Sequence, residues 1–168
     1  MSLKQYTNEL TAEELAELDK SHEFTPEELA NMHPDALAVI ERSAEHIRLH
    51  PVKRIYRAVV AGSLTRMGGV VDDPGTPPEE CLQGLLDNGE WATVVTEGAT
   101  VSYPDGTTAK IANSAGLSCA IDGKGIAVVS SLLDNGDEII STPCKTLTFT
   151  EREGVPMPED FLVAVKGA

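Results

Sequence analysis

The spacing of hydrophobic positions changes part-way along the chain. Four apolar residues recur at helical spacing and predict a helix over residues 34–49: Leu37, Ile40, Ala44 and Ile47. Two shorter helices are predicted upstream, because Thr11 and Thr25 each precede a glutamate three residues later, the pattern of a capping box. From residue 56 onward, short runs rich in Val, Ile and Thr predict strands instead.

Dipeptides that favour tight turns lie between several of these predicted strands. Asn-Gly and Asp-Gly pairs favour tight hairpins, because a type I′ turn needs a positive φ at both central residues. Four such pairs occur, and all 14 glycines lie at or after Gly62. We therefore expect a mainly β structure of short antiparallel strands and hairpins with an N-terminal helical extension. The turns are Asn88-Gly89, Asp105-Gly106, Asp122-Gly123 and Asn135-Gly136, and the strands cover residues 56–61, 69–71, 91–96, 99–103, 107–112, 117–121, 125–131 and 137–142.

Three regions follow from this division. Residues 1–57 are predicted to form the helical extension, 58–142 the β-domain, and 143–168 a tail ending in a strand over 161–165. A short internal repeat, Leu85 to Glu90 recurring as Leu132 to Asp137, indicates that one hairpin unit is used more than once.

Composition narrows the function classes. The net charge of −14 argues against nucleic acid and anionic membranes as partners, since both attract basic surfaces. No apolar run is long enough to span a membrane. The three cysteines form no CxxC pair, so no zinc ribbon or thioredoxin motif is predicted, and a reducing cytoplasm is expected.

Candidate chemistry is sparse. All four histidines lie in the predicted helical part, and His46 and His50 lack a carboxylate placed to complete a zinc site. The acidic run at residues 134–138 lacks the alternating ligands of a calcium loop. No catalytic residue, metal ligand or cofactor site is predicted, which favours a binding or structural module over an enzyme.

One block resembles a known family. The run from Val59 to Val71 is similar to the opening block of PAAR-repeat proteins, roughly Val-x-x-Gly-Asp-x-Thr-x-x-Gly-Gly-x-Val. Residues 97–111 resemble a second family unit, and residues 122–128 resemble another copy. The residues identified as the motif for spike binding or structure are Gly62, Ser63, Thr65, Gly68, Gly69, Gly98, Asp105, Gly106, Asp122 and Gly123.

The resemblance implies a fold, a partner and a location. It implies a small cone or prism of short strands that caps the trimeric spike (VgrG-like or phage spike) of a type VI secretion system or contractile phage tail. Such a protein is cytoplasmic before assembly and is then delivered with the machine. The helical extension would bind an effector or a chaperone, or brace the cone.

The chain also departs from the family pattern. The Gly-Asp of the opening block is Gly62-Ser63 here, and the Pro-Ala-Arg core is Thr108-Ala109-Lys110. Family members usually bind zinc at the tip through His and Cys, but this β region contains no histidine. No metal site is carried over, and we expect a tip closed by packing.

Two other functions stay open. A β-rich oligomeric adaptor unrelated to secretion would explain the turn series equally well but not the Gly68-Gly69 block. A glycosidase-like enzyme would need two carboxylates at a set separation, and nothing in the sequence places such a pair.

Overall fold

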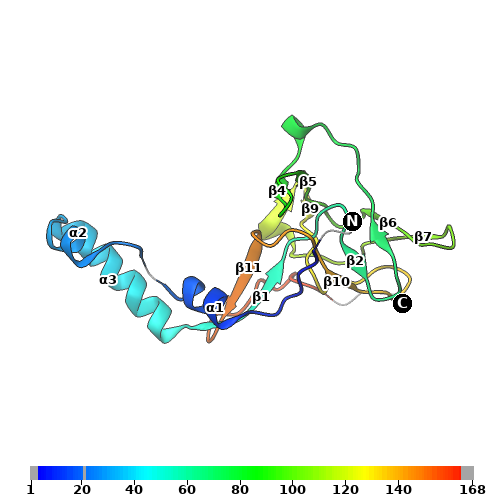
Figure 1. Ribbon diagram of the computed structural model, residues 1–168. Coiled ribbons are helices and arrows are strands. Elements are labelled where there is room, and N and C mark those ends of the chain that lie inside the picture. Colours follow the sequence, from blue (N-terminus) through cyan, green and yellow to red (C-terminus); the bar gives the residue numbers. More distant parts are fainter. Residues whose placement is uncertain (1–3, 21, 164–168) are drawn as a thin grey trace. The chain divides into compact units, whose positions relative to one another are not determined.

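The computed structural model describes residues 4–20 and 22–163, which fall into two compact units (Figure 1). The helical unit comprises residues 9–55 and 150–156. The β unit comprises residues 56–149 together with the N-terminal residues up to 8 and the tail from 157 onward.

The helical unit contains the three expected helices. They are α1 (Ala12–Leu18), α2 (Pro26–Ala30) and α3 (Pro34–Leu49). Both predicted capping boxes are confirmed: the Glu14 amide donates to the Thr11 hydroxyl at 3.1 Å, and the Glu28 amide donates to the Thr25 hydroxyl at the same distance. No residue of the three helices is buried, so α3 leaves its apolar stripe at least partly uncovered.

The rest of the chain is mainly β, as predicted, and its strands are short and antiparallel. One sheet has the order β10-β2-β3-β6-β7, and the other sheets pair β1 with β11, β4 with β5, and β8 with β9. The strands are β1 (Val52–Arg57), β2 (Leu64–Thr65), β3 (Val70–Val71), β4 (Gln83–Leu85), β5 (Trp91–Thr93), β6 (Thr100–Ser102), β7 (Thr108–Lys110), β8 (Ala120–Ile121), β9 (Lys124–Gly125), β10 (Ile139–Ser141) and β11 (Thr148–Arg152).

A three-way junction of backbone segments lies at the centre of the β unit. Val59 donates its amide hydrogen to the Ala127 carbonyl, Ala127 donates to Val95, and Val95 donates back to Val59, at 2.9, 3.0 and 3.0 Å. A second cycle surrounds the first: Ala61 donates to Thr93, Glu97 to Gly125, and Val129 to Arg57. Three segments, 57–63, 93–99 and 125–131, are therefore related by a pseudo-threefold axis.

A hairpin follows each junction segment and repeats the symmetry. The hairpins cover residues 64–71, 100–111 and 132–139, and the middle one is the longest. Their turns place Gly68, Gly106 and Gly136 at φ of 89°, 88° and 88°. An isolated bridge joins Ile111, next to β7, to Leu133 of the third hairpin, and a second bridge between Leu132 and Glu138 closes that hairpin next to β10, so the hairpins form a closed prism.

The side chains of the junction face two cores. Val59, Val95 and Ala127 lie in a buried cluster with Val71, Ile111, Leu133 and Ile139 of the hairpins. Their neighbours Ala58, Val60, Val94 and Ile126 face a second cluster, which Leu86 and Cys144 of the connecting segments complete. This alternation follows from the period of two in extended backbone.

Several boundaries differ from the sequence-based prediction. Residues 117–119 form a 3₁₀ turn instead of a strand. The strand expected at 161–165 is wrong over its described part, because Leu162 has a φ of 51° and residues 161–162 form a turn; residues 164 and 165 lie outside the described part. Residues 58–60, 94–96 and 126–128 form isolated bridges, since each segment changes partner at the axis.

The boundaries of the two units also differ from those of the expected regions 1–57, 58–142 and 143–168. Tyr6 forms a two-way backbone bridge with Thr142, which places the N-terminal residues in the β unit. Arg152 donates to Asp19 and to the carbonyls of Leu18 and His50, which places residues 150–156 in the helical unit. These long-range contacts have no local sequence signal.

Candidate interaction surface

Two residues of the sequence-predicted motif occupy equivalent positions in the junction. Gly62 and Gly98 have φ of 95° and 92°, and the third position is Ser130 with φ of 102°. This is the left-handed region that glycine adopts without steric cost. Each residue donates its amide hydrogen to the last strand of its own hairpin: Gly62 to Val71, Gly98 to Ile111 and Ser130 to Ile139.

Ser63 fixes the turn that follows. Its hydroxyl donates to the Val60 carbonyl at 2.8 Å and lies 3.2 Å from the Val60 amide nitrogen. Ser131 repeats this arrangement by accepting from the Val128 amide at 3.0 Å. Both side chains are fully buried. The serine of the opening block therefore has a structural role here.

Thr65 and Gly69 belong to a polar cluster at the hairpin ends. The Thr65 hydroxyl accepts from the Gly69 amide at 2.8 Å, and the Tyr103 hydroxyl donates to the Asp137 carboxylate at 2.5 Å. A Cβ at Gly69 would lie 2.7 Å from Val101, so only glycine permits this approach. Thr65, Tyr103 and Asp137 come from the first, second and third hairpins, so a hydrogen-bonded cluster closes this end of the prism.

Two pKa shifts accompany this cluster. Burial by itself raises the pKa of Asp137, but hydrogen bonds from Thr65, Tyr103 and two backbone amides outweigh it and hold that pKa below its ordinary value. Burial, followed by the hydrogen bond to Asp137, raises the pKa of Tyr103. The cluster is therefore built around an ionised Asp137 and a neutral Tyr103.

The remaining motif residues lie in turns. Gly68 and Asp105-Gly106 form the ends of the first two hairpins, and Asp105 accepts from the Thr107 amide at 3.0 Å. Asp122-Gly123 forms the turn between β8 and β9, which lies in a connecting segment and not in a prism hairpin. The structure therefore does not bring Asp122 and Gly123 together with the other motif residues.

Sequence reasoning missed the third-repeat members of the junction, Ser130 and Ser131. The signal was weak, because the three segments start 36 and 32 residues apart (57 to 93, 93 to 125) and share only small or apolar character. The Asn135-Gly136 turn was recognised, but its resemblance to Asn88-Gly89 pointed to β4–β5, which lies in a connecting segment.

The two ends of the prism differ. The side of the junction opposite the hairpins is covered by connecting segments of unequal length. The hairpin turns present three equivalent and exposed residues, Met67, Asp105 and Asn135, and the Met67 side chain is 64% exposed. The hairpin end is therefore the part of the β unit that offers a threefold-related surface.

The described residues contain no group of three or more His, Cys, Asp or Glu side chains that could hold a metal ion. Within the same residues, no helix combines the length and apolarity needed to cross a membrane. Comparisons with family models, curated proteins and solved structures find no match.

Proposed function

We propose that this chain is a non-enzymatic, PAAR-like protein that caps and sharpens the tip of a trimeric spike in a type VI secretion or contractile injection machine. The observation that carries the proposal is the closed pseudo-threefold junction formed by Val59, Val95 and Ala127 of a single chain. A monomer with internal threefold symmetry can offer the same contact to each subunit of a trimer. The resemblance of residues 59–71 to the PAAR opening block supports the same assignment.

The hairpin end is the surface we assign to the trimer. Met67, Asp105 and Asn135 stand at equivalent turns, and the hydrogen-bonded cluster beneath them keeps the three hairpins in register. The opposite side lacks this symmetry, because the connecting segments cover it. The middle hairpin would mark one subunit of the trimer as distinct, since it is the longest.

The helical unit supports a second part of the proposal, which is carriage of an effector or chaperone. Its three helices bury no residue, and α3 keeps Val39 and Leu49 more than half exposed. Helices this short need tertiary contacts to persist, and a bound protein would supply them. On this proposal the protein assembles in the cytoplasm and leaves the cell with the machine.

The test is light scattering after size exclusion. The protein is measured alone and then with the trimeric spike protein encoded beside its gene. The proposal expects a monomer alone and a complex of one chain with three spike subunits. Self-assembly that ignores the spike would instead support the β-rich oligomeric adaptor.

A point variant locates the contact. Met67→Glu places a charge on the proposed interface and is expected to weaken spike binding at least about tenfold, because an apolar contact is lost. The matched control is Leu117→Glu, since Leu117 is 69% exposed and lies in a connecting segment. Equal weakening by both variants, or by neither, would argue against the hairpin end as the contact surface.

A further inference from the structure

We call the space alongside each junction segment a groove, and a piece of the chain itself occupies the first one. The floor is residues 57–63, and the occupant is the N-terminal segment. Tyr6 exchanges two backbone hydrogen bonds with Thr142, at 2.8 and 2.9 Å. Gln5 donates to the carbonyl of Gly62 on the floor, and the Tyr6 hydroxyl reaches Asp87 on the opposite wall.

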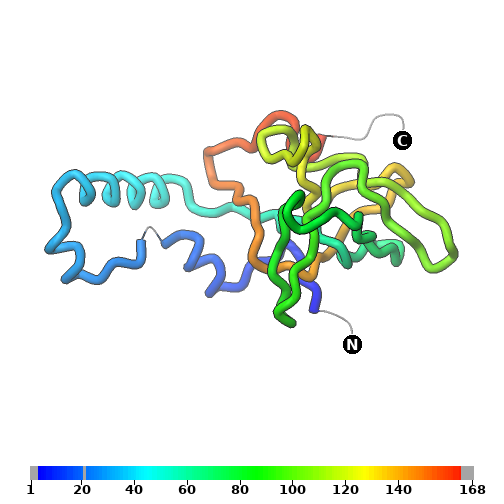
Figure 2. The backbone as a smooth tube through the Cα atoms, turned by 90° about the horizontal axis from the view of Figure 1, so that it is seen from above, coloured from blue at the N-terminus to red at the C-terminus, as the bar shows by residue number. Residues whose placement is uncertain are grey.

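The C-terminal tail occupies the second groove, which lies beside the junction segment 125–131 between Ser114 and Tyr56. Leu162 donates its amide hydrogen to the Ser114 carbonyl at 2.7 Å, as Tyr6 does to Thr142. Phe161 stacks edge-on against Tyr56 with the ring centroids 4.7 Å apart, and the Asp160 carboxylate accepts from the Leu117 amide. Both paths can be followed in Figure 2, at the blue and red ends of the tube. Each of these two grooves thus holds a piece of chain with one aromatic side chain, extended at Tyr6 and turned at Leu162.

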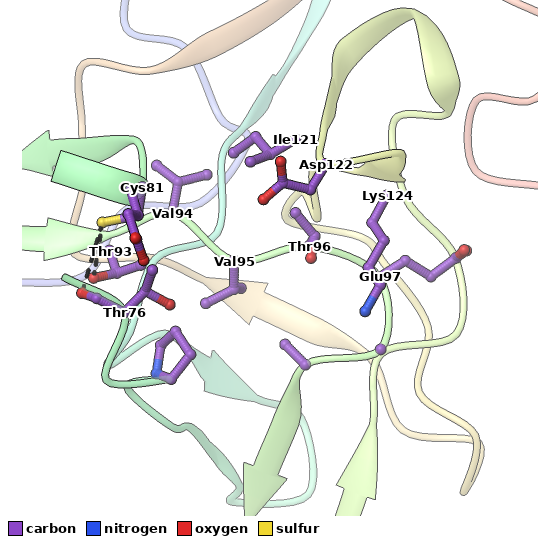
Figure 3. A pocket seen from close by; sticks show the side chains of 14 residues that line it. Thr76, Cys81, Thr93, Val94, Val95, Thr96, Glu97, Ile121, Asp122 and Lys124 are labelled. Atoms are coloured by element: carbon purple, nitrogen blue, oxygen red, sulfur yellow. Dashed lines mark hydrogen bonds between the residues drawn. The ribbon is translucent and has the colours of Figure 1, made fainter. Parts of the chain in front are cut away.

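The third groove lies at the equivalent place along its junction segment and has no occupant among the described residues. Its floor is residues 93–99, one wall is residues 74–81, and the other is residues 121–124 (Figure 3). It encloses about 290 Å³. Tyr56, which packs against the tail in the second groove, corresponds to Lys124 here, because each directly precedes a junction segment. Within the described part of the chain, the carbonyls of Asp73 and Pro74 accept no hydrogen bond.

The lining of this groove defines what it would bind. Val94 and Val95 belong to the floor, and the lining also includes three carboxylates and one ammonium group. Figure 3 shows Asp122 and Lys124 on one wall, facing Thr76 and Cys81 across the floor. The lining charges, three negative and one positive, belong to Glu80, Glu97, Asp122 and Lys124 and favour a basic ligand.

We propose that the third groove binds an extended segment of a partner polypeptide that carries an aromatic side chain flanked by basic residues. The partner backbone donates to the free carbonyl of Asp73 or Pro74, as Tyr6 and Leu162 donate in the other grooves. Its aromatic ring lies on the floor, and its basic groups face Glu97 and Asp122. This proposal does not depend on binding to a spike.

The first experiment uses the intact protein and a synthetic blocked peptide, Lys-Phe-Lys-Val-Lys. Peptide binding is followed by amide NMR shifts. Gly75, whose amide adjoins the Pro74 carbonyl, and Gly98 and Gly123 are expected to shift, while Gly136 is not. The peptides Lys-Ala-Lys-Val-Lys and Glu-Phe-Glu-Val-Glu are expected to bind at least fivefold more weakly. Equal binding of all three peptides, shifts elsewhere, or no shift at millimolar peptide would overturn the proposal.

A charge-neutral double variant tests the walls. Glu97→Gln with Asp122→Asn keeps the side-chain shapes, and asparagine tolerates the φ of 50° at position 122. We expect binding of Lys-Phe-Lys-Val-Lys to weaken about fivefold or more, given what exposed charge pairs contribute. The control, Glu90→Gln with Asp134→Asn, makes the same charge change outside the groove. An equal loss in both double variants would show a nonspecific charge effect and refute the assigned site.

Discussion

At the scale of the residue, the junction depends on three positive φ angles, and one of them is not glycine. Ser130 has φ of 102°, which costs an L-residue about 1–2 kcal/mol relative to glycine. Its hydroxyl partly compensates by accepting from Asn8 at 3.2 Å. The third repeat therefore carries strain that Gly62 and Gly98 avoid.

Opposite substitutions at two equivalent positions test this strain. Gly98→Ala is expected to lower the free energy of unfolding by about 1–2 kcal/mol, through φ alone, since a Cβ there would meet open space. Ser130→Gly is expected to cost nothing or to stabilise by up to about 1 kcal/mol. Urea denaturation measures both. Ser130→Ala is the control, because it removes the hydroxyl and keeps the strain; a stabilising Gly98→Ala would contradict the prediction.

Ionisation of Asp137 is expected to make the stability of the hairpin cluster depend on pH in the acidic range. Its folded pKa lies below its unfolded value, so its ionisation stabilises the fold above an unfolded pKa of 3.8, and that contribution is lost as pH falls through the folded pKa. Asp137→Asn is expected to lower the free energy of unfolding by about 1–3 kcal/mol at neutral pH, because it removes a charged, fully buried acceptor.

The pH dependence distinguishes this effect from a packing defect. The difference between Asp137→Asn and the parent should shrink when urea denaturation is repeated at successively lower pH below 3.8, because the unfolded parent then takes up its proton before the folded protein does. Asp134→Asn, in the same hairpin but exposed, is the control and should leave the curve nearly unchanged. A gap that stays constant from neutral to acid pH would rule out the charge as the cause.

At the scale of the element, local signals predicted local structure well. The capping boxes at Thr11 and Thr25 and the turns Asp105-Gly106 and Asn135-Gly136 are read from adjacent residues, and the structure contains them. The junction could not be read in this way. Its equivalences lie in backbone hydrogen bonds, which any residue can accept through its carbonyl, so Arg57, Thr93 and Gly125 correspond as acceptors without any similarity in side chain.

The second helix offers an element-scale prediction. Thr25→Ala removes the hydroxyl that accepts from the Glu28 amide, and a cap of this kind contributes about 1 kcal/mol. Because α2 has only five residues and no buried side chain, amide exchange at Leu29 should become about fivefold faster. Thr25→Ser keeps an acceptor and should restore protection, whereas unchanged exchange in Thr25→Ala would mean that other contacts hold α2.

At the scale of the whole molecule, the β unit has pseudo-threefold symmetry although its sequence repeats are unequal. The three hairpins and junction segments repeat, but the connecting segments, the N-terminal residues and the tail do not. Two of the three grooves are closed by distant pieces of the same chain, around Tyr6 and Phe161. The third groove is closed by none of the described residues. This difference from the other two grooves is the reason we propose it as the binding surface for a partner.

This arrangement makes the tail part of the β unit, and Phe161→Ala tests that role. Loss of the ring that packs on Tyr56 is expected to lower the free energy of unfolding by about 1–3 kcal/mol, below the cost at a fully buried site because Phe161 is half-buried. Urea denaturation followed by circular dichroism measures the change.

The control for the tail is Phe24→Ala, which deletes the same ring from a 44% exposed position in the helical unit and should cost less than about 0.5 kcal/mol. The amides of Leu117 and Leu162 should also exchange faster in Phe161→Ala, because Leu117 donates to Asp160 of the tail and Leu162 donates to the Ser114 carbonyl. A stable Phe161→Ala variant with unchanged exchange at these two amides would mean that the tail only rests on the second groove. Filling of the second groove by the tail would then contribute no measurable stability, and it would no longer support the expectation that the third groove binds a partner segment.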